Sequence, residues 1–564
     1  MKKLLILIIL VPVYLCAQVE VTDKLPVPFS LTAEPGTDIF VQFENPIDTA
    51  SVTSMSFQVF GRWSGPMSGE LDWNNDLTEL TFIADRDFFS GEWVSVNMTH
   101  AILSAEGDVL ESGYGFSFWI RTLPGYLDLP ETQIIEMRLP GEVFIQCYGA
   151  YAGDMNNDES SDLVVVNEDS EDLRILLNDG DGNYPDAFEL IDMPGATKPS
   201  TNEGADFDLD GEIDLATGST QGPEVSVFFG DGSGSLGPET VYNASSGVRG
   251  LTLLDMNADG YTDIVTASRN GDNIGLFVNN GDGTFADPEF IDTGSTAETA
   301  AAAGDFNSDG VMDIAIATYT GSEIFILLGD GQGNFTIGEG FPVNSNPWMI
   351  GIGDVNGDGN LDVASANAGG ANVSIHFGDG LGGLGAPTYY STGDFPLAID
   401  LGDLDGDGDL DFISSNYFSV NFTLYENMGD GTYLNPRTYD AYGAGSCAIF
   451  HDRNNDGIMD MTCIDEIDDL VLLYDNSPVT EVSESIDKNR FEVWPNPASD
   501  FIEIQGEQGT TVDVKIISLD GRIIQDYGVL HLPGRLKTSQ IAPQACVISL
   551  QYQNENHSKG LIIK

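Results

Sequence analysis

The sequence predicts an all-β protein: a seven-bladed, calcium-binding β-propeller flanked by two β-sandwich domains. Three observations carry this prediction. One acidic phrase recurs seven times at intervals of 49 to 52 residues. Each interval contains short runs of alternating apolar and polar residues, which are typical of strands. Similar runs, separated by Asp-, Gly- and Ser-rich turns, fill the segments before and after the repeats.

The repeated unit has the composition of four short strands. In the fourth copy, residues 299–304 lead into the acidic phrase, 312–318 and 323–328 alternate as strands, and a GDGQGNF turn precedes a last strand from Phe335. Units of four antiparallel strands repeated radially form propeller blades, and fixed-period repeats of this length indicate such an array. Seven copies in phase therefore predict a propeller.

We expect the ring to close through its N-terminal end. After the last acidic phrase, LVLLYDNSPV runs into a polar segment without a fourth strand, whereas residues 132–139 (TQIIEMRL) precede the first phrase. A strand at 132–139 that completes the last blade would remove the exposed edge of an open ring. The alternative is an open solenoid of the same units.

The acidic phrase reads D-x-[DN]-x-D-G-x-x-D and predicts a metal site. Calcium takes six to eight oxygen ligands in flexible geometry, and a glycine permits the sharp turn between them. We expect side chains 1, 3, 5 and 9, with a backbone carbonyl near position 7, to surround one ion. The predicted ligands are Asp154, Asn156, Asp158, Asp162, Asp206, Asp208, Asp210, Asp214, Asp255, Asn257, Asp259, Asp263, Asp305, Asn307, Asp309, Asp313, Asp354, Asn356, Asp358, Asp362, Asp403, Asp405, Asp407, Asp411, Asp452, Asn454, Asp456 and Asp460.

Charge supports this prediction over its alternative, Asx-rich turns without an ion. The chain has 90 Asp and Glu against 21 Lys and Arg, a formal net charge of −69. Grouped carboxylates repel or retain protons unless a cation offsets them, so we expect about seven Ca²⁺ ions. Magnesium is less suited because it prefers rigid octahedra and keeps its waters. The first loop is the weakest site, since Glu159 replaces the turn glycine.

The same charge excludes two classes of partner. Nucleic acid is bound by Lys and Arg that neutralise phosphates, and anionic membrane surfaces attract basic segments. A chain with so large an acidic excess fits neither.

The loops resemble the FG-GAP/VCBS repeats of integrin α-subunit propellers and of many bacterial surface proteins. The resemblance covers roughly residues 132–476, and the phrases FFGDG, LLGDGQGNF and HFGDG match the second signature of that family. It implies one Ca²⁺ in each loop, all on one face of the ring. It leaves the ligand open, because such propellers serve adhesion, sugar binding and, occasionally, enzyme scaffolding.

Residues 18–122 precede the repeats and predict the first β-sandwich. The strand-like runs IFVQF, ELTFIA, WVSVNM and FSFWI lie within it, as expected for a sandwich of about 100 residues. It is similar to the bacterial Ig-like domains of exported proteins, with a role as spacer or as packing partner of the propeller. Prolines and a glycine within 123–130 mark its boundary, so we place the propeller at 130–476.

Residues 490–564 follow a polar linker at 477–489 and predict the second sandwich. The phrases PNPAS and SLDGR and the closing strand resemble the C-terminal sorting domain of the type IX secretion system. The resemblance implies recognition by that machinery, export across the outer membrane, and release or surface attachment. The alternative is an ordinary terminal β-domain. Residues 544–547 (QACV) depart from the family pattern, and we expect an irregular last hairpin there.

Residues 1–17 have a signal-peptide pattern: two lysines, an apolar run and a small residue, Ala17. We expect cleavage after Ala17 rather than lipidation of Cys16, because bulky Leu15 occupies a position that lipoprotein signals fill with a small residue. No later segment has the pattern of a membrane span. These features predict a protein that is secreted or held at the outer-membrane surface of a Gram-negative bacterium.

Four further cysteines, Cys147, Cys447, Cys463 and Cys546, are too few for a disulfide scaffold in a chain of 564 residues. Cys447 and Cys463 flank one acidic loop. They either bridge neighbouring strands or remain buried thiols, and the sequence leaves both open.

The sequence contains no catalytic constellation. The five histidines are scattered without metal-ligand spacing, and neither a nucleophile elbow nor a P-loop occurs. We therefore expect a calcium-binding surface or secreted protein for adhesion, or for glycan or protein binding. The alternative is the propeller scaffold of an extracellular polysaccharide-degrading lyase or hydrolase. Five aromatic residues between loops either line a sugar-binding face or pack between blades: Trp348, Tyr389, Tyr390, Tyr417 and Phe418.

Overall fold

The computed structural model describes residues 18–127, 129–185 and 187–476, together with the strands of the C-terminal domain between 491 and 563. The predicted signal peptide at 1–17 and the linker at 477–489 lie outside the described residues. Contacts divide the chain into two compact units. The first comprises residues 1–123 and 129–475, and the second comprises 124–128 and 476–564.

The N-terminal part of the first unit is a sandwich of two antiparallel sheets. Its core consists of alternate residues of facing strands, such as Val41 on one sheet and Val96 on the other, as two-residue periodicity requires. Its strands are β1 (Val21–Leu25), β2 (Ile39–Phe43), β6 (Glu79–Ala84) and β5 (Gly69–Trp73) in one sheet, and β4 (Gly65–Pro66), β3 (Phe57–Gly61), β7 (Trp93–Met98) and β8 (Tyr114–Trp119) in the other, with one short 3-10 helix, η1 (Thr49–Ser51). The Ig-like relationship of this sandwich stays a prediction.

The repeats form seven four-stranded antiparallel sheets. The first four are β10 (Cys147–Gly153), β11 (Asp162–Asn167), β12 (Asp172–Leu176), β13 (Glu189–Asp192); β14 (Pro199–Ala205), β15 (Asp214–Ser219), β16 (Glu224–Phe228), β17 (Thr240–Asn243); β18 (Val248–Leu254), β19 (Asp263–Ser268), β20 (Asn273–Phe277), β21 (Glu289–Ile291); and β22 (Glu298–Gly304), β23 (Asp313–Thr318), β24 (Glu323–Gly329), β25 (Phe335–Pro342).

The remaining three sheets continue the same order. They are β26 (Pro347–Gly353), β27 (Asp362–Asn367), β28 (Asn372–His376), β29 (Thr388–Ser391); β30 (Pro396–Gly402), β31 (Asp411–Asn416), β32 (Asn421–Asn427), β33 (Tyr433–Asp440); and β34 (Gly445–His451), β35 (Asp460–Asp465), β36 (Leu470–Tyr474) with β9 (Glu131–Glu136). The second strand of every sheet is buried along its whole length, because it lies between neighbouring sheets that cover both of its faces.

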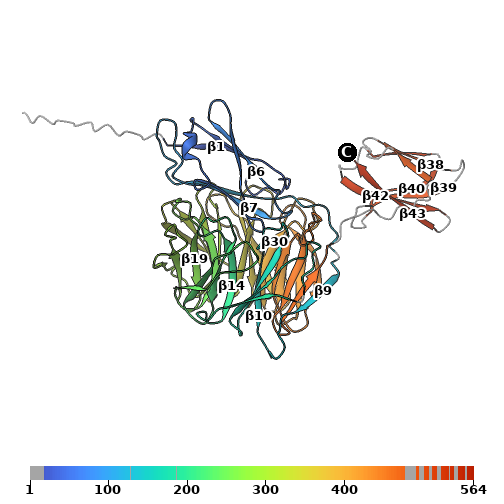
Figure 1. Cartoon of the computed structure of the whole chain (residues 1–564). Helices are drawn as coiled ribbons and strands as arrows, with labels where there is room; N and C mark the ends of the chain where they lie inside the picture. The colour runs from blue at the N-terminus through green and yellow to red at the C-terminus, as the bar shows by residue number, and fades with distance from the viewer. Residues whose placement is uncertain are drawn as a thin grey trace, which may run out of the picture. The chain divides into compact units, whose positions relative to one another are not determined.

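The first strands of the sheets line the ring axis and close a circle. Each contacts the first strand of the next sheet, and β34 contacts β10. Strand β9 supplies the fourth strand of the last sheet, where Ile135 pairs with Val471 and Ile134 with Leu472. Figure 1 shows β9, in the blue-cyan of the early part of the chain, beside the orange strands of that sheet. The predicted closure by the N-terminal strand is therefore confirmed.

The buried cysteines of the propeller are free thiols. Cys147, Cys447 and Cys463 are all unbridged. In the β34–β35 pair, Cys447 lies opposite Ile464 and Cys463 lies opposite Ala448, one step out of register with each other. Of the two alternatives that the sequence left open, the structure has the buried thiols.

The second unit contains a smaller sandwich, as the sequence predicts for residues 490–564. Its described sheets are β37 (Phe491–Trp494), β38 (Phe501–Gly506), β41 (Gly534–Lys537) and β40 (Ile523–His531), β39 (Thr511–Ile517), β42 (Gln544–Tyr552), β43 (Glu555–Ile563). Strands β42 and β43 pair without a register shift, so the expectation of an irregular last hairpin was wrong. Within the described part of the chain, no helix has the length and apolarity needed to cross a bilayer.

Strand β9 offers a matched test of ring closure. Ile135 is 1% exposed and Ile134 is 43% exposed, on opposite faces of one strand. We expect Ile135→Asp to destabilise the protein by about 3 kcal/mol or more, because it buries an unpaired charge. Ile134→Asp carries the same loss of strand propensity and should cost about 1 kcal/mol or less. Equal urea midpoints for the two variants would contradict closure by this strand.

Candidate functional site

Each acidic loop joins the first and second strands of its sheet and is folded around the aspartate at position 1. In the fourth loop, Asp305 Oδ1 accepts the Asp309 backbone N–H at 3.2 Å, and Oδ2 accepts that of Gly310 at 2.8 Å. All seven loops repeat this pair of bonds. The first predicted ligand is therefore also the residue that organises the loop.

The aspartate at position 9 anchors the loop to the next turn of the same sheet. Asp313 Oδ2 accepts the Phe306 N–H at 2.9 Å, and Oδ1 accepts the Gly329 N–H at 2.8 Å, sixteen residues further on. Six loops share both bonds, through Asp162, Asp214, Asp263, Asp313, Asp362 and Asp411. In the seventh loop, Asp460 is equally buried.

The side chains at positions 3 and 5 converge on position 1. In the second loop, carboxylate oxygens of Asp206, Asp208 and Asp210 lie within 4.8 Å of one another, and the corresponding aspartates of the sixth loop, Asp403, Asp405 and Asp407, do the same. The other loops carry Asn at position 3, as in Asn307, whose amide donates to Asp309 at 2.9 Å. The donor set is hard oxygen throughout, which fits Ca²⁺.

Position 6 adopts a left-handed backbone in every loop, with φ between 81° and 96° at the six glycines and 64° at Glu159. This conformation is free of steric cost only for glycine. The first loop nevertheless keeps the hydrogen bonds of the others, since Asp154 accepts the Glu159 N–H at 3.1 Å. Glu159 therefore introduces backbone strain without changing the hydrogen bonds of the loop, and the weaker metal site stays a prediction.

Burial makes these carboxylates hard to ionise without a cation. Desolvation, followed by neighbouring aspartates, raises the pKa of Asp452 to about 8. Burial likewise raises the pKa of Asp206 to about 6, and the pKa of Asp214 and Asp362 to about 8, against the backbone N–H bonds that lower it. A bound divalent ion would reverse this balance, since it favours the ionised form.

The N-terminal sandwich packs on these loops. Arg86 forms an ion pair with Asp154 Oδ2 at 2.9 Å, and the Asn97 amide donates to Asp255 Oδ2 at 2.9 Å. Further contacts are backbone bonds: Gly115 N–H to the Gly310 carbonyl at 2.6 Å and Leu123 N–H to the Gly457 carbonyl at 2.7 Å. The sandwich is thus a packing partner of the ring rather than a spacer, and it packs against the face that carries the predicted metal loops.

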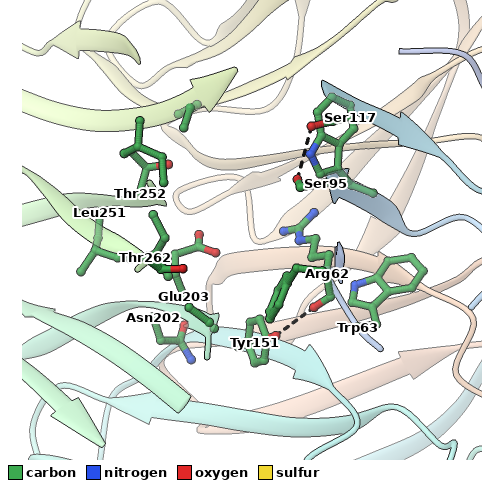
Figure 2. A pocket seen from close by; sticks show the side chains of 18 of the residues that line it. Arg62, Trp63, Ser95, Ser117, Tyr151, Asn202, Glu203, Leu251, Thr252 and Thr262 are labelled. Atoms are coloured by element: carbon green, nitrogen blue, oxygen red, sulfur yellow. Dashed lines mark hydrogen bonds between the residues drawn. The ribbon is translucent and has the colours of Figure 1, made fainter. Parts of the chain in front are cut away.

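A cavity of about 1030 Å³ follows the ring axis beneath the sandwich. Arg62 reaches into it and pairs with Asp400 at 3.2 Å, while its carbonyl accepts the Tyr151 hydroxyl at 2.8 Å (Figure 2). Glu203 faces the same space, and desolvation, partly offset by Arg62, raises its pKa to about 7. The Arg62–Asp400 pair ties the sandwich to the inner strands.

The cavity ends, away from the sandwich, at three side chains from alternate sheets. Tyr148 accepts hydrogen bonds from Trp348 Nε1 at 2.8 Å and from Arg249 at 3.1 Å, so these residues meet across the axis. Around them lie Arg269, Tyr319, Phe395, Tyr417 and Phe418 in a continuous set of ring contacts. We call this group the axial mouth.

Sequence reasoning found only part of the axial mouth. Trp348, Tyr417 and Phe418 belong to it, but Tyr390 packs against Phe412, Tyr425 and Tyr433 inside the ring, and Tyr389 lies on the outer strand β29.

One signal in the sequence could have revealed the rest of the mouth. The residue after each second strand is Glu168, Thr220, Arg269, Tyr319, Ala368, Tyr417 and Glu466. Acidic, basic, aromatic and small residues all occur at this equivalent position, whereas the acidic loops have nearly the same sequence in every repeat.

His376 and His451 are held by hydrogen bonds within the propeller. His451 is buried, with Nδ1 2.9 Å from Ser161 Oγ and Nε2 2.8 Å from Thr462 Oγ1. Desolvation lowers its pKa to about 3. His376 is buried and bonds the Gly385 carbonyl at 3.1 Å. Neither contacts a carboxylate among the described residues.

Two regions of the chain match known family models. Residues 154–217, 206–266, 255–316, 305–365 and 354–414 match the FG-GAP-like repeat, and residues 492–564 match the secretion system C-terminal sorting domain. Neither model covers the N-terminal sandwich. No curated protein matches this sequence.

Solved structures similar in fold share little sequence with this chain. An Agrocybe aegerita lectin described as recognising non-reducing terminal N-acetylglucosamine is 16% identical, covering 75% of this chain and 99% of its own, at a TM-score of 0.39. Pseudomonas aeruginosa periplasmic gluconolactonase PpgL is 13% identical, with 69% and 97% covered and a TM-score of 0.41. BBS1N in complex with ARL6DN is 11% identical, with 62% and 97% covered and a TM-score of 0.44.

The raised pKa values predict that the metal-free protein becomes less stable as the pH rises. A carboxyl whose folded pKa lies above its unfolded value keeps its proton in the folded state, so stability falls as pH rises from about 4 to about 8. We expect the melting temperature in EDTA to drop between pH 5 and pH 8, and the increase on adding Ca²⁺ to grow over the same range. A Ca²⁺ effect independent of pH would contradict proton displacement from the loops.

Variants of two loop glycines distinguish the cost of backbone strain from the loss of contact between the sandwich and the ring. A Cβ on Gly310 would lie 2.3 Å from the Tyr114 ring, whereas one on Gly359 would meet nothing within 4 Å, and φ is +81° and +85° respectively. Both Gly→Ala changes should cost about 1–2 kcal/mol of backbone strain. Only Gly310→Ala should also loosen the sandwich, detected as faster proteolysis between sandwich and ring. Equal proteolysis of both variants would show that the contact is dispensable.

Proposed function

We propose that this chain, an exported propeller with FG-GAP-like repeats and a secretion-system sorting tail, is a calcium-stabilised binding protein of the cell surface or the extracellular medium. The observation that carries the proposal is the division of the ring into two faces. The N-terminal sandwich packs against the face with the acidic loops, and the opposite face presents the axial mouth.

Several observations support calcium. Each loop gathers hard oxygen side chains, two loops hold three carboxylates within 4.8 Å, and the aspartates at positions 1 and 9 are held in place by backbone N–H groups. In the first loop the Arg86 guanidinium already offsets part of the charge of Asp154. We therefore expect six comparable sites and a weaker first site, with Ca²⁺ stabilising the folded chain by mass action.

Three observations support a binding role over a catalytic one. The described residues of the propeller offer no histidine paired with a carboxylate, and His376 and His451 have structural partners. The three-carboxylate groups, Asp206 to Asp210 and Asp403 to Asp407, belong to the acidic loops, where we expect them to hold metal ions. The hydroxyl of Tyr148 at the axial mouth keeps its proton at neutral pH, because burial raises its pKa to about 12, so little of the phenolate is present to act as a base.

The alternative, a polysaccharide-degrading enzyme on a propeller scaffold, is distinguished by turnover. Sustained release of reducing ends or unsaturated products from a purified polysaccharide, lost on changing one carboxylate outside the loops, would establish it.

The sorting domain determines where this function operates. Its presence implies recognition by the type IX secretion machinery, and we propose that the mature protein faces the outside of the outer membrane or is released from it. The ligand would then be a surface glycan or protein met outside the cell.

Metal analysis of the dialysed full-length protein tests the calcium part of the proposal. We expect six to seven calcium ions per chain, which follows from the number of loops and the weaker first site, and a large fall in melting temperature on chelation. Asp407→Ala, in the most acidic loop, should remove about one ion and leave the ring folded. Asp440→Ala, on outer strand β33, is the matched control and should keep every ion. A protein without calcium and with an unchanged melting temperature in EDTA would overturn the proposal.

A further inference from the structure

Two arginines of the axial mouth lack the carboxylate partner that every other arginine of the first unit has. Residues 18–127, 129–185 and 187–476 contain nine arginines, and seven of them form ion pairs with Asp or Glu: Arg62, Arg86, Arg121, Arg138, Arg174, Arg437 and Arg453. Arg249 and Arg269 form none within these residues. In a chain with a net charge of −69, two neighbouring arginines without an ion pair are unexpected.

The two guanidinium groups are held by aromatic rings. Arg249 lies 4.5 Å from the Trp348 ring centre and donates to Tyr148, while Arg269 lies 3.9 Å from the Tyr319 ring and 5.0 Å from that of Trp348. A guanidinium stacked on a ring keeps N–H donors in its plane for a planar anion. Burial, and then the charge of Arg249, lowers the pKa of Arg269, and a bound anion would offset both effects.

The opposite side of the mouth offers hydrogen-bond acceptors. Glu168 and Glu466 are 5% and 4% exposed, and burial raises the pKa of each to about 7, although the nearby charge of Arg249 acts to lower it. Glu466 Oε1 accepts from Gln146 at 2.9 Å. Glu168 Oε1 and Glu466 Oε2 have no partner among the described residues. Buried acceptors without partners are costly unless a ligand supplies donors.

The mouth also has an exposed apolar surface. Phe418 is 66% exposed, and its ring centre lies 4.9 Å from that of Phe395, which in turn lies 5.6 Å from that of Trp348. A large aromatic ring held in the open by its neighbours is suited to the C–H face of a ring-shaped ligand.

We propose that the axial mouth binds a uronate residue of an acidic polysaccharide. The sugar carboxylate lies against Arg249 and Arg269, its hydroxyls donate to Glu168 and Glu466, and its C–H face rests on Phe418. An inorganic anion would leave the unpartnered glutamate oxygens without donors, and a neutral sugar would leave both arginines without an ion pair. This inference rests on the proposed binding function and names the ligand class and the site.

Titration calorimetry on the calcium-loaded full-length chain tests the inference. The probes are oligosaccharides of galacturonate, glucuronate and mannuronate, together with the methyl ester of each. We expect at least one acid form to bind, and its ester to bind about tenfold or more weakly, as loss of charge-assisted bonds implies. Arg249→Gln and Arg269→Gln should each weaken binding by a similar factor, and Arg269→Lys should restore only part of it, because lysine lacks the planar fork.

Arg121→Gln is the matched control, since Arg121 pairs with Glu34 on the exposed surface of the sandwich. It should leave binding unchanged, and the melting temperature and calcium content of every variant should match those of the unmodified chain. Binding of acids and esters alike, or no binding of any uronate, would overturn the inference. Binding of neutral glycans alone, unaffected by the arginine variants, would preserve the binding function but refute this site. Competition by a short acidic peptide instead would assign the mouth to a protein partner and refute the sugar class.

Discussion

The burial of carboxylates at the start of each acidic loop is the constraint on which the rest of the structure depends. One aspartate accepts two backbone N–H groups and thereby folds the loop, as Asp305 does for Asp309 and Gly310. This geometry demands a left-handed residue at position 6 and brings further carboxylates to the same point. The loops therefore gather carboxyls that retain protons or repel one another unless a cation is bound, and this is why we propose a divalent cation there.

The N-terminal sandwich is adapted to this charged face. It supplies a guanidinium from Arg86 and an amide from Asn97 to position-1 aspartates, and it sends Arg62 into the axial cavity to pair with Asp400. Gly310 serves both requirements, since its left-handed backbone closes the loop and its missing side chain admits Tyr114. Folding of the loops and docking of the sandwich are thus coupled through the same few residues.

The two faces of the ring differ in how much their residues vary between repeats. The acidic loops keep aspartate at positions 1, 5 and 9 in all seven repeats, because the same backbone turn has to be stabilised in each. At the opposite ends of the second strands the residues diverge, from Glu168 and Glu466 on one side to Arg269 and Tyr319 on the other. The ring thus repeats its backbone but varies its side chains at this rim, and we propose that this asymmetry serves one ligand.

The sequence by itself determined the elements and the loops. Short-range patterns encode strand alternation, the acidic phrase and the spare strand at 132–139, and each depends on residues close in the chain. The axial mouth depends on Tyr148, Arg249 and Trp348, which stand about one hundred residues apart and meet only because alternate sheets face the same axis. The pairing of Arg86 with Asp154 likewise required the docking of two domains. Only the tertiary structure decided these contacts, because the diameter of the ring and the placement of the sandwich bring together side chains that no local pattern relates.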